Sequence, residues 1–189
     1  MRIVAGTARG RTLKTPRGSD VTRPTADRVR ETIFNVLGQT CDGLRVLDLF
    51  AGTGALGLEA VSRGAVKAVL VDQGREAVGL CRENVAALGF GDRVEVLALP
   101  VTKALTQLAQ AGAQFELVFS DPPYALRAGL DVLTALGPLV VPYGVAVIEH
   151  ERAEVLPEAL GPWAREDERT FGATVVSIYR RREGPESSD

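Results

Sequence analysis

The chain of 189 residues has few of the side chains that bind metal ions or form disulfides, since it contains only two cysteines and one histidine. Cys41 and Cys81 show no partner spacing, and a single histidine leaves no zinc-ligand set. We therefore expect two buried or half-buried thiols, a structural His150 at the end of an apolar strand, and a function that uses no metal.

Long apolar runs are also absent from the sequence. No stretch approaches the roughly 20 apolar residues of a membrane span, and residues 1–6 lack the apolar core of a signal peptide. With 46% hydrophobic residues, the length suffices for one substantial core. These features predict a soluble, cytoplasmic protein with no membrane partner, built as one domain plus an appendage.

Positive charge is in slight deficit over the whole chain but concentrated at its start. The net charge is −2, whereas residues 1–30 hold eight basic and two acidic side chains, a local charge of +6 that leaves −8 for the remainder. Neutralising phosphates supplies most of the sequence-independent affinity for nucleic acid. The asymmetry favours a basic arm that contacts phosphates, and the alternative is a merely solvated basic segment.

A glycine-rich stretch at residues 46–57, VLDLFAGTGALG, organises the rest of the chain. It predicts a strand, a tight loop and a helix, because Gly52 and Gly54 can adopt positive φ and the helix that follows points free N–H groups at a ligand. Gly52-x-Gly54-x-x-Gly57 matches the dinucleotide fingerprint, and Asp72 follows Gly52 by 20 residues. The loop therefore binds a nucleotide-like molecule, and a nicotinamide cofactor is one candidate.

A second motif, Asp121-Pro122-Pro123-Tyr124, ends a later strand. The Asp121 side chain and the Pro122 carbonyl can accept the hydrogens of an exocyclic amine and free its lone pair, while the consecutive prolines stiffen the turn. Tyr124 offers a ring on which an extruded base can stack. An ordinary proline turn would explain the prolines but not the acid before them and the aromatic after them.

The two motifs together resemble the amino-methyltransferases that use S-adenosylmethionine, in which Asp-x-Phe-x-Gly-x-Gly precedes Asp-Pro-Pro-Tyr. Asp72, at the end of the second strand, can accept both ribose hydroxyls of a nucleoside, and its alternative role is to cap the helix that starts near Gly74. Asp48 could orient the loop or meet the methionine ammonium. Relatives often hold the adenine amino group with an acid after the third strand, but here Leu99 and Pro100 stand there, so backbone groups and packing would recognise the adenine.

Hydrophobic periodicity predicts alternating strands and helices. The strands are expected at residues 44–49, 65–71, 93–97, 115–120 and 145–149, and the helices at 55–63, 75–88, 102–110 and 129–136. Such an alternation predicts an α/β Rossmann-like fold with a parallel sheet covered by helices on both faces. Residues 2–15 predict a small basic hairpin and residues 25–37 a helix, whereas 154–160 predict a short helical piece and 163–169 with 174–181 a closing hairpin.

The opening of the chain resembles the RsmD-type 16S ribosomal RNA guanine-N2 methyltransferases of class I. The resemblance is carried by Arg2-Ile3-Val4-Ala5-Gly6, Arg9-Gly10-Arg11, Arg23-Pro24-Thr25 and residues 27–35, DRVRETIFN, and it runs to about Arg181. It implies a seven-stranded, mostly parallel sheet with one antiparallel member. It divides the chain into a basic RNA-binding extension (1–38), a methyltransferase domain (39–182) and a disordered tail (183–189).

The same resemblance implies which residues act. Those expected to hold S-adenosylmethionine are Asp48, Phe50, Gly52, Gly54 and Asp72. The guanine is expected at Asp121, Pro122, Pro123 and Tyr124. The RNA is expected at Arg9, Arg11, Arg23, Arg28 and Arg30. The implied partner is 16S rRNA in a largely assembled small subunit, with no metal and no obligate protein partner. Methylation of DNA adenine or protein glutamine, a nicotinamide enzyme and a non-catalytic RNA-binding module stay open as alternatives.

Overall fold

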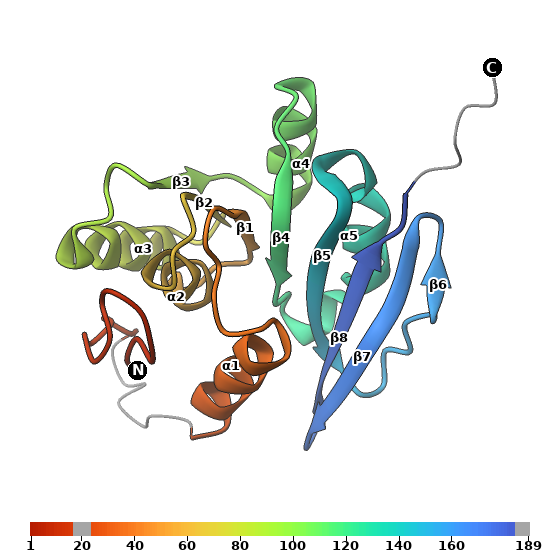
Figure 1. Cartoon of the computed structure of the whole chain (residues 1–189), viewed down its shortest axis with the longest axis horizontal. Coiled ribbons are helices and arrows are strands. Elements are labelled where there is room, and N and C mark those ends of the chain that lie inside the picture. Colours follow the sequence, from red (N-terminus) through yellow and green to blue (C-terminus); the bar gives the residue numbers. More distant parts are fainter. Residues whose placement is uncertain (17–23, 184–189) are drawn as a thin grey trace.

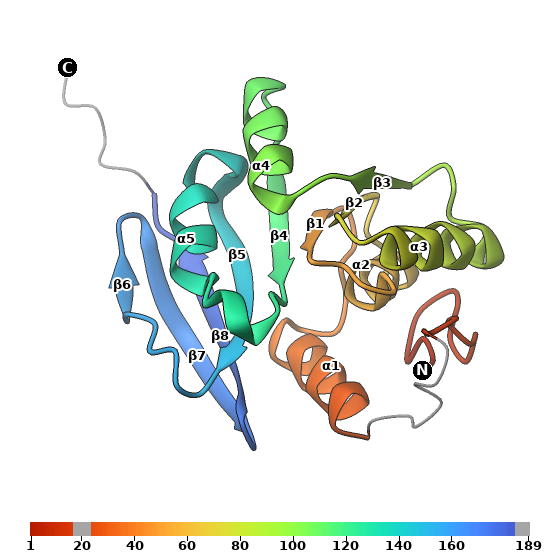
Figure 2. The same cartoon turned by 180° about the vertical axis from the view of Figure 1, so that it is seen from behind.

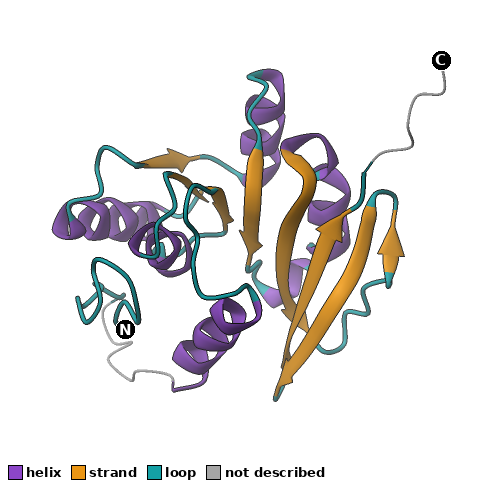
Figure 3. Ribbon diagram, in the orientation of Figure 1, coloured by secondary structure: helices purple, strands orange, loops and turns teal. Residues whose placement is uncertain are grey.

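The computed structural model describes residues 1–16 and 24–183, without the side chains of residues 24–26 and 124. Its strands are β1 (Arg45–Leu49), β2 (Lys67–Asp72), β3 (Val94–Ala98), β4 (Phe115–Ser120), β5 (Val140–Glu151), β6 (Ala159–Leu160), β7 (Trp163–Phe171) and β8 (Thr174–Arg181). They form one sheet in the order β3-β2-β1-β4-β5-β8-β7-β6 (Figure 1, Figure 3). Strands β1 to β5 pair in parallel, and β8 pairs antiparallel with both β5 and β7. The predicted fold class is confirmed, with the two-residue β6 as an additional edge strand.

Helices cover both faces of the sheet, as the alternation predicts. The first three helices, α1 (Pro24–Val36), α2 (Ala55–Ser62) and α3 (Arg75–Leu88), lie on one face, and α4 (Val101–Gln110) and α5 (Gly129–Ala135) lie on the other (Figure 1, Figure 2). Successive residues of a strand point to opposite faces, so Val46 joins the core under α1 to α3 while Leu47 joins the core under α4 and α5. Short 3-10 turns, η1 (Tyr124–Leu126) and η2 (Gly137–Leu139), flank α5.

The topology brings four acids to one edge of the sheet. The strand order reverses between β1 and β4, and in open α/β sheets ligands bind outside the carboxyl ends of the strands at such a switch point. Asp48, Asp72 and Glu149 stand at or near the carboxyl ends of β1, β2 and β5, and Asp121 directly follows β4. The carboxyl edge of the sheet is therefore the place to look for a site.

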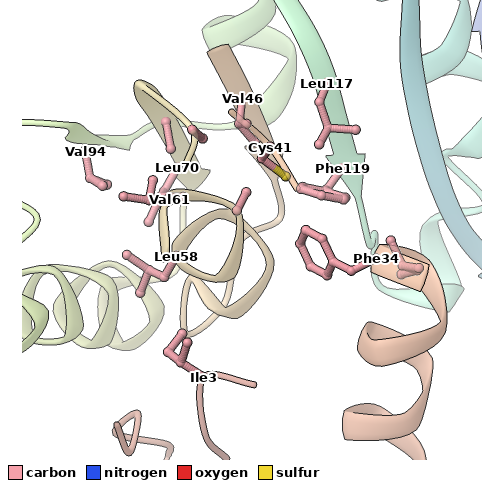
Figure 4. Close-up of a cluster of buried hydrophobic side chains, with 14 of the residues drawn as sticks. Ile3, Phe34, Cys41, Val46, Leu58, Val61, Leu70, Val94, Leu117 and Phe119 are labelled. Atoms are coloured by element: carbon pink, nitrogen blue, oxygen red, sulfur yellow. The ribbon is translucent and has the colours of Figure 1, made fainter. Parts of the chain in front are cut away.

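The first 16 residues pack closely on α2. Residues 2 and 12 pair in one isolated antiparallel bridge. The predicted hairpin is therefore present only as this bridge, without a continuous pair of strands. The reason is that Val4 and Ala5 donate their amide hydrogens to the buried carboxylate of Glu59 on α2, at 2.8 and 3.0 Å. Ile3 and Leu13 are buried in the core, and Figure 4 shows Ile3 beside Leu58 of α2. The segment thus shares the core of the sheet.

Helix α1 is anchored to the sheet through its aromatic side chain. The ring of Phe34 lies 5.6 Å from that of Phe119 on β4, centroid to centroid (Figure 4). The guanidinium of Arg63 covers the Phe34 ring at 4.5 Å from its centroid. Phe34 and Phe119 are both fully buried. This contact fixes α1 above the carboxyl half of β4, next to the acids described above.

Two expectations for the last third of the chain need correction. Residues 154–160 are not helical: they form a loop that ends in β6, because Pro157 interrupts the segment and Ala159 and Leu160 pair with β7 instead. Strand β5 begins at Val140, five residues earlier than predicted, after a register shift in its pairing with β4. The closing hairpin is confirmed, with its turn at Gly172. The predicted disordered tail lies outside the described residues from 184 onward.

The cysteines and the histidine have the structural roles expected. Cys41 and Cys81 are buried, and burial raises the pKa of their thiols to about 11 and about 12. His150 is buried, and its Nε2 lies 3.0 Å from the Ser177 hydroxyl. Among the helices of residues 24–183, none is long and apolar enough to cross a membrane.

Candidate active site

The glycine loop between β1 and α2 has the backbone conformation that its sequence predicts. Gly52 and Gly54 have φ of +58° and +79°, and Phe50 adopts φ of +57°, a left-handed conformation that is uncommon and strained for an aromatic residue. A Cβ at Gly52 would meet no atom within 4 Å, whereas one at Gly57 would come within 2.3 Å of Leu70. Gly52 therefore leaves the loop open to a ligand, and Gly57 lets α2 pack tightly on the sheet.

Asp72 ties this loop to the start of α3 through its two carboxylate oxygens. One oxygen accepts the amide hydrogen of Gly52 at 2.9 Å, and the other accepts that of Gly74, the N-cap of α3, at 2.8 Å. The capping role is thus present alongside the loop contact. Each carboxylate oxygen has a second lone pair, so Asp72 can still accept hydroxyl donors from a ligand.

Asp48 lies underneath the loop and orients it. Its carboxyl group is 2% exposed and accepts the amide hydrogen of Gly57 at 2.8 Å. Its pKa is raised to about 8, mainly by burial and in smaller part by the negative charges of Asp121 and Asp72, while the hydrogen bond from Gly57 opposes the shift. Of the two roles considered for Asp48, orienting the loop is visible in the structure, and the neighbouring cavity is lined by the same residue.

A cavity of about 200 Å³ opens at the switch point between β1 and β4. Asp48, Asp121 and Glu149 contribute three carboxyl groups to its lining. Loss of hydration raises the pKa of Asp121 to about 6, although part of the residue is exposed to solvent. Burial and the nearby charge of Asp121 raise the pKa of Glu149 to about 8. We call this space the acidic cavity.

Glu149 was not identified from the sequence as a site residue. It ends an apolar strand, as Asp48 and Asp121 do, and its place at the carboxyl end of β5 was the available signal. Glu149 and Asp121 are far apart in the sequence, and they come close only because β4 pairs with β5.

A wider and mostly apolar groove of about 760 Å³ lies next to the acidic cavity, and Phe50 lines both. Its floor and walls come from the segment after β2 and from α4, η1 and α5, including Gln73, Val101, Leu105 and Leu126. Pro100 also lines it, at the position where relatives often carry an acid. The volume is in the range of small-molecule sites, about 300–1,000 Å³. We call it the apolar groove.

The Asp121–Tyr124 turn lies between the acidic cavity and the apolar groove. The Asp121 amide donates to the Leu49 carbonyl, with 3.4 Å between nitrogen and oxygen, which ties the end of β4 to the end of β1. Pro122 is buried, Pro123 is exposed, and Tyr124 begins η1, although its side chain lies outside the described residues. The turn therefore places the Asp121 carboxyl at the cavity and starts η1 at the rim of the groove.

The basic side chains expected to contact RNA lie in different surroundings. Arg9 and Arg28 are exposed, and Arg11 is exposed while it donates to the Ala87 carbonyl at 2.5 Å. Arg23 lies outside the described residues. Arg30 is 4% exposed and lines the acidic cavity, so it faces the inside of the molecule and not the surface.

Comparison with known proteins agrees with this geometry. The family model described as Conserved hypothetical protein 95 matches residues 1–180. Ribosomal RNA small subunit methyltransferase D of Escherichia coli (strain K12) is 36% identical over 190 residues, which cover 99% of this chain and 93% of the relative. The chain belongs to this family, the RsmD-type methyltransferases.

Solved structures support the same fold. The Escherichia coli protein yhhF superposes with a TM-score of 0.82 at 36% identity, covering 96% of this chain and 98% of that one. An RNA methyltransferase from Salinibacter ruber in complex with S-adenosyl-L-homocysteine gives a TM-score of 0.62 at 17% identity, covering 94% and 99%. At 17% identity the likeness bears on the fold alone, which is that of the class I methyltransferases.

Proposed function

We propose that this protein transfers a methyl group from S-adenosylmethionine to the exocyclic N2 amine of one guanine in small-subunit ribosomal RNA. The observation that carries the proposal is the Asp121–Tyr124 turn, which sets the Asp121 carboxyl group in the lining of the acidic cavity and starts η1, whose Leu126 lines the neighbouring apolar groove. The Escherichia coli relative named as a small-subunit rRNA methyltransferase supports the substrate class. The choice of guanine N2 and of an assembled subunit rests on the sequence resemblance. A ribosomal substrate places the reaction in the cytoplasm.

The residues present fit this methyl donor. Its adenine is a neutral, flat ring that suits the apolar groove, with Asp72 beside the loop to accept ribose hydroxyls. Its methionine part carries charges that suit the acidic cavity. Because Gly52 has no side chain and the space beside it is open, the loop backbone can approach the donor closely. Adenine would be recognised by shape and by backbone groups, since Pro100 stands where an acid is often found. Among residues 1–16 and 24–183 there is no cluster of acids, cysteines and histidine that could hold a metal ion.

The donor supplies a methyl group on a positively charged sulfur, which makes it reactive towards an aligned amine. The protein has to position the amine and free its lone pair. Ionised Asp121 and the Pro122 carbonyl would accept the two hydrogens of the amine, and Glu149 adds a second carboxyl group on the cavity wall. The nitrogen becomes more acidic as it gains the methyl group, so a carboxylate with a pKa of about 6 suffices to receive the proton.

The base reaches this position only if it leaves its stack, because the site is too narrow for a helix. Tyr124 would stack on the extruded guanine, as aromatic side chains do in single-stranded nucleic acid binding. Arg9, Arg11 and Arg28 would contact phosphates on the surface near the N-terminal segment. Asp121 and Tyr124 thus have separate tasks in one turn, hydrogen-bond acceptance and stacking.

The proposal is tested by incubating the protein with methyl-labelled S-adenosylmethionine and three acceptors: purified small subunits, free rRNA and DNA. Nucleosides are then separated and identified by mass spectrometry. The expected result is N2-methylguanine in small subunits at one position. Label in DNA adenine or in protein would identify one of the alternative substrates, and label in none of them would contradict methyl transfer.

A further inference from the structure

Arg30 occupies a position that RNA binding does not explain. It lies on α1, is 4% exposed, and lines the acidic cavity beside Asp48 and Asp121. Arg28, two residues earlier on the same helix, is exposed and suits a contact with a surface phosphate. A buried guanidinium at a cavity wall is instead placed to bind something inside the cavity.

The hydrogen bonds that Arg30 donates to the described residues all come from Nη2 and leave its buried Nε without a partner. Its Nη2 donates to the Arg2 carbonyl at 2.6 Å and to an Asp27 carboxylate oxygen at 3.1 Å. Its Nε is fully buried and has no hydrogen-bond partner among the described residues. Buried polar groups in native proteins are nearly always paired, so an unpaired one calls for an explanation such as a ligand that is absent.

The nearest acid cannot fill this gap. An oxygen of Glu59 lies 3.8 Å from Arg30 Nε, which is beyond hydrogen-bond distance. The two oxygens of Glu59 already accept the amide hydrogens of Val4 and Ala5 and the Nε hydrogen of Arg63, at 2.8 to 3.0 Å. Arg63 also balances the charge of Glu59. Arg30 is also ion-paired with Asp27, a side chain that is partly exposed, and its guanidinium still lines the cavity.

The charges around the cavity match an amino-acid tail of both signs. Asp48, Asp121 and Glu149 provide three carboxyl groups, and Arg30 provides a guanidinium. Carboxylates attract an ammonium and a sulfonium, whereas a guanidinium binds a carboxylate through paired, charge-assisted hydrogen bonds. The methionine part of the methyl donor carries all three of these charged groups.

We infer that Arg30 binds the α-carboxylate of the methionine part of S-adenosylmethionine, so that α1 completes the donor site. The inference rests on the proposed function, because it assumes this donor. It assigns Arg30 to the donor and leaves the exposed Arg9, Arg11 and Arg28 to the RNA. The N-terminal extension then contributes to both binding sites, since Arg2 holds the Arg30 side chain through its carbonyl.

The test is calorimetric binding of two ligands that differ by one group: S-adenosylhomocysteine and its decarboxylated analogue, which keeps the adenosine, the sulfur and the ammonium. Wild-type protein should bind the first about 10- to 100-fold more tightly than the second, the scale of charge-assisted hydrogen bonds. Arg30→Gln should lose about this factor for S-adenosylhomocysteine and change its affinity for the analogue by less than about threefold. Arg30→Lys, which keeps the charge, should recover part of the loss.

Arg28→Gln is the matched control, because it removes an arginine from the same helix without touching the cavity, and it should leave both affinities unchanged. Equal losses for the two ligands in Arg30→Gln would overturn the inference, since the residue would then act only through structure. Equal affinity of wild-type protein for the two ligands would also overturn it, without any variant. Failure of wild-type protein to bind either ligand would overturn the donor assignment itself, and with it this inference.

Discussion

The acidic cavity and the apolar groove share Phe50 yet differ in chemistry. The cavity of about 200 Å³ is lined by three carboxyl groups and one guanidinium, and the groove of about 760 Å³ is lined mostly by apolar side chains of α4, η1 and α5. A charged ligand group would bind in the cavity through favourable electrostatic interactions. A neutral ring would bind in the groove because its apolar surface is buried there. One molecule with a neutral nucleoside at one end and a charged tail at the other matches both.

Because of this difference, the acidic cavity and the apolar groove should respond to different perturbations. Charge substitutions and pH changes should act on the cavity and leave recognition of the nucleoside intact. The reacting amine also enters on the cavity side, where Asp121 lies, so transfer itself should be the most sensitive property. The following variants separate these contributions, beginning with the largest expected effect.

Asp121→Ala should give the largest loss. It removes the acceptor that matters most as positive charge builds on the amine, and kcat should fall by roughly 10²–10³, as for loss of one preorganised polar group at a charge-developing centre. Single-turnover methylation of small subunits measures the rate, and calorimetry with S-adenosylhomocysteine checks that donor affinity changes little. A variant that methylates at a near-normal rate would show that amine activation does not depend on Asp121.

Asp72→Ala should weaken donor binding by about 1–3 kcal/mol, the scale of hydrogen bonds to a charged group. The loss has two sources: the ribose hydroxyls lose an acceptor, and the loop loses the bond to the Gly52 amide. Asp72→Asn is the control, since its carbonyl oxygen can keep one of the two backbone bonds. Unchanged affinity for S-adenosylhomocysteine in folded Asp72→Ala would remove Asp72 from the site.

Asp48→Asn should change how stability depends on pH. The folded-state pKa of about 8 lies above the ordinary aspartate value of 3.8, so between these values the folded protein binds a proton that the unfolded chain has released. Stability contributed in this way is present at low pH and is lost as pH rises towards about 8, by at most about 1.4 kcal/mol per pH unit. Asparagine keeps an acceptor for the Gly57 amide and cannot ionise.

Urea unfolding at about pH 5 and about pH 8 measures this effect. Wild-type protein should lose more stability between the two pH values than Asp48→Asn does. Part of the slope should persist in the variant, because the pKa values of Asp121 and Glu149 are also raised. Identical slopes in the two proteins would mean that Asp48 is ionised in the folded state.

Arg9→Gln, outside both hollows, should have the smallest effect. One exposed phosphate contact contributes little affinity, and its loss should lower the slope of log affinity against log salt by about one unit. Binding of the protein to small subunits across a salt series measures the slope. Deleting the whole segment would be less informative, because it would leave Glu59 buried without the amide donors of Val4 and Ala5.

Much of this site could be predicted from short-range patterns. The positive φ of Gly52 and Gly54, the acids at the ends of β1 and β2 and the proline turn after β4 all follow from residues close in sequence. The roles of Glu149 and Arg30 could not be predicted in this way, because they depend on which strands pair and on where α1 packs. Arg30 was expected at the RNA from the family resemblance of the basic opening, and neither the resemblance nor the charge of this segment reveals burial.

The segment at 154–160 illustrates the same limit. Its composition allowed a short helix, but Ala159 and Leu160 gain backbone hydrogen bonds by pairing with β7, a contact that local propensity does not contain. Tertiary pairing routinely overrides a weak helical preference, most of all in a segment interrupted by proline.

The most direct test of the central claim, that both hollows hold one donor, is the pH dependence of binding of two ligands to wild-type protein. S-adenosylhomocysteine has the charged tail, and 5′-methylthioadenosine has the nucleoside and sulfur without it. Lowering pH from about 8.5 to about 6 protonates Asp48 and Glu149, with pKa values of about 8, and begins to protonate Asp121. Affinity for S-adenosylhomocysteine should fall by about tenfold, the effect of roughly 1.4 kcal/mol, while affinity for 5′-methylthioadenosine stays constant. Parallel changes for the two ligands, or no change for either, would contradict the claim.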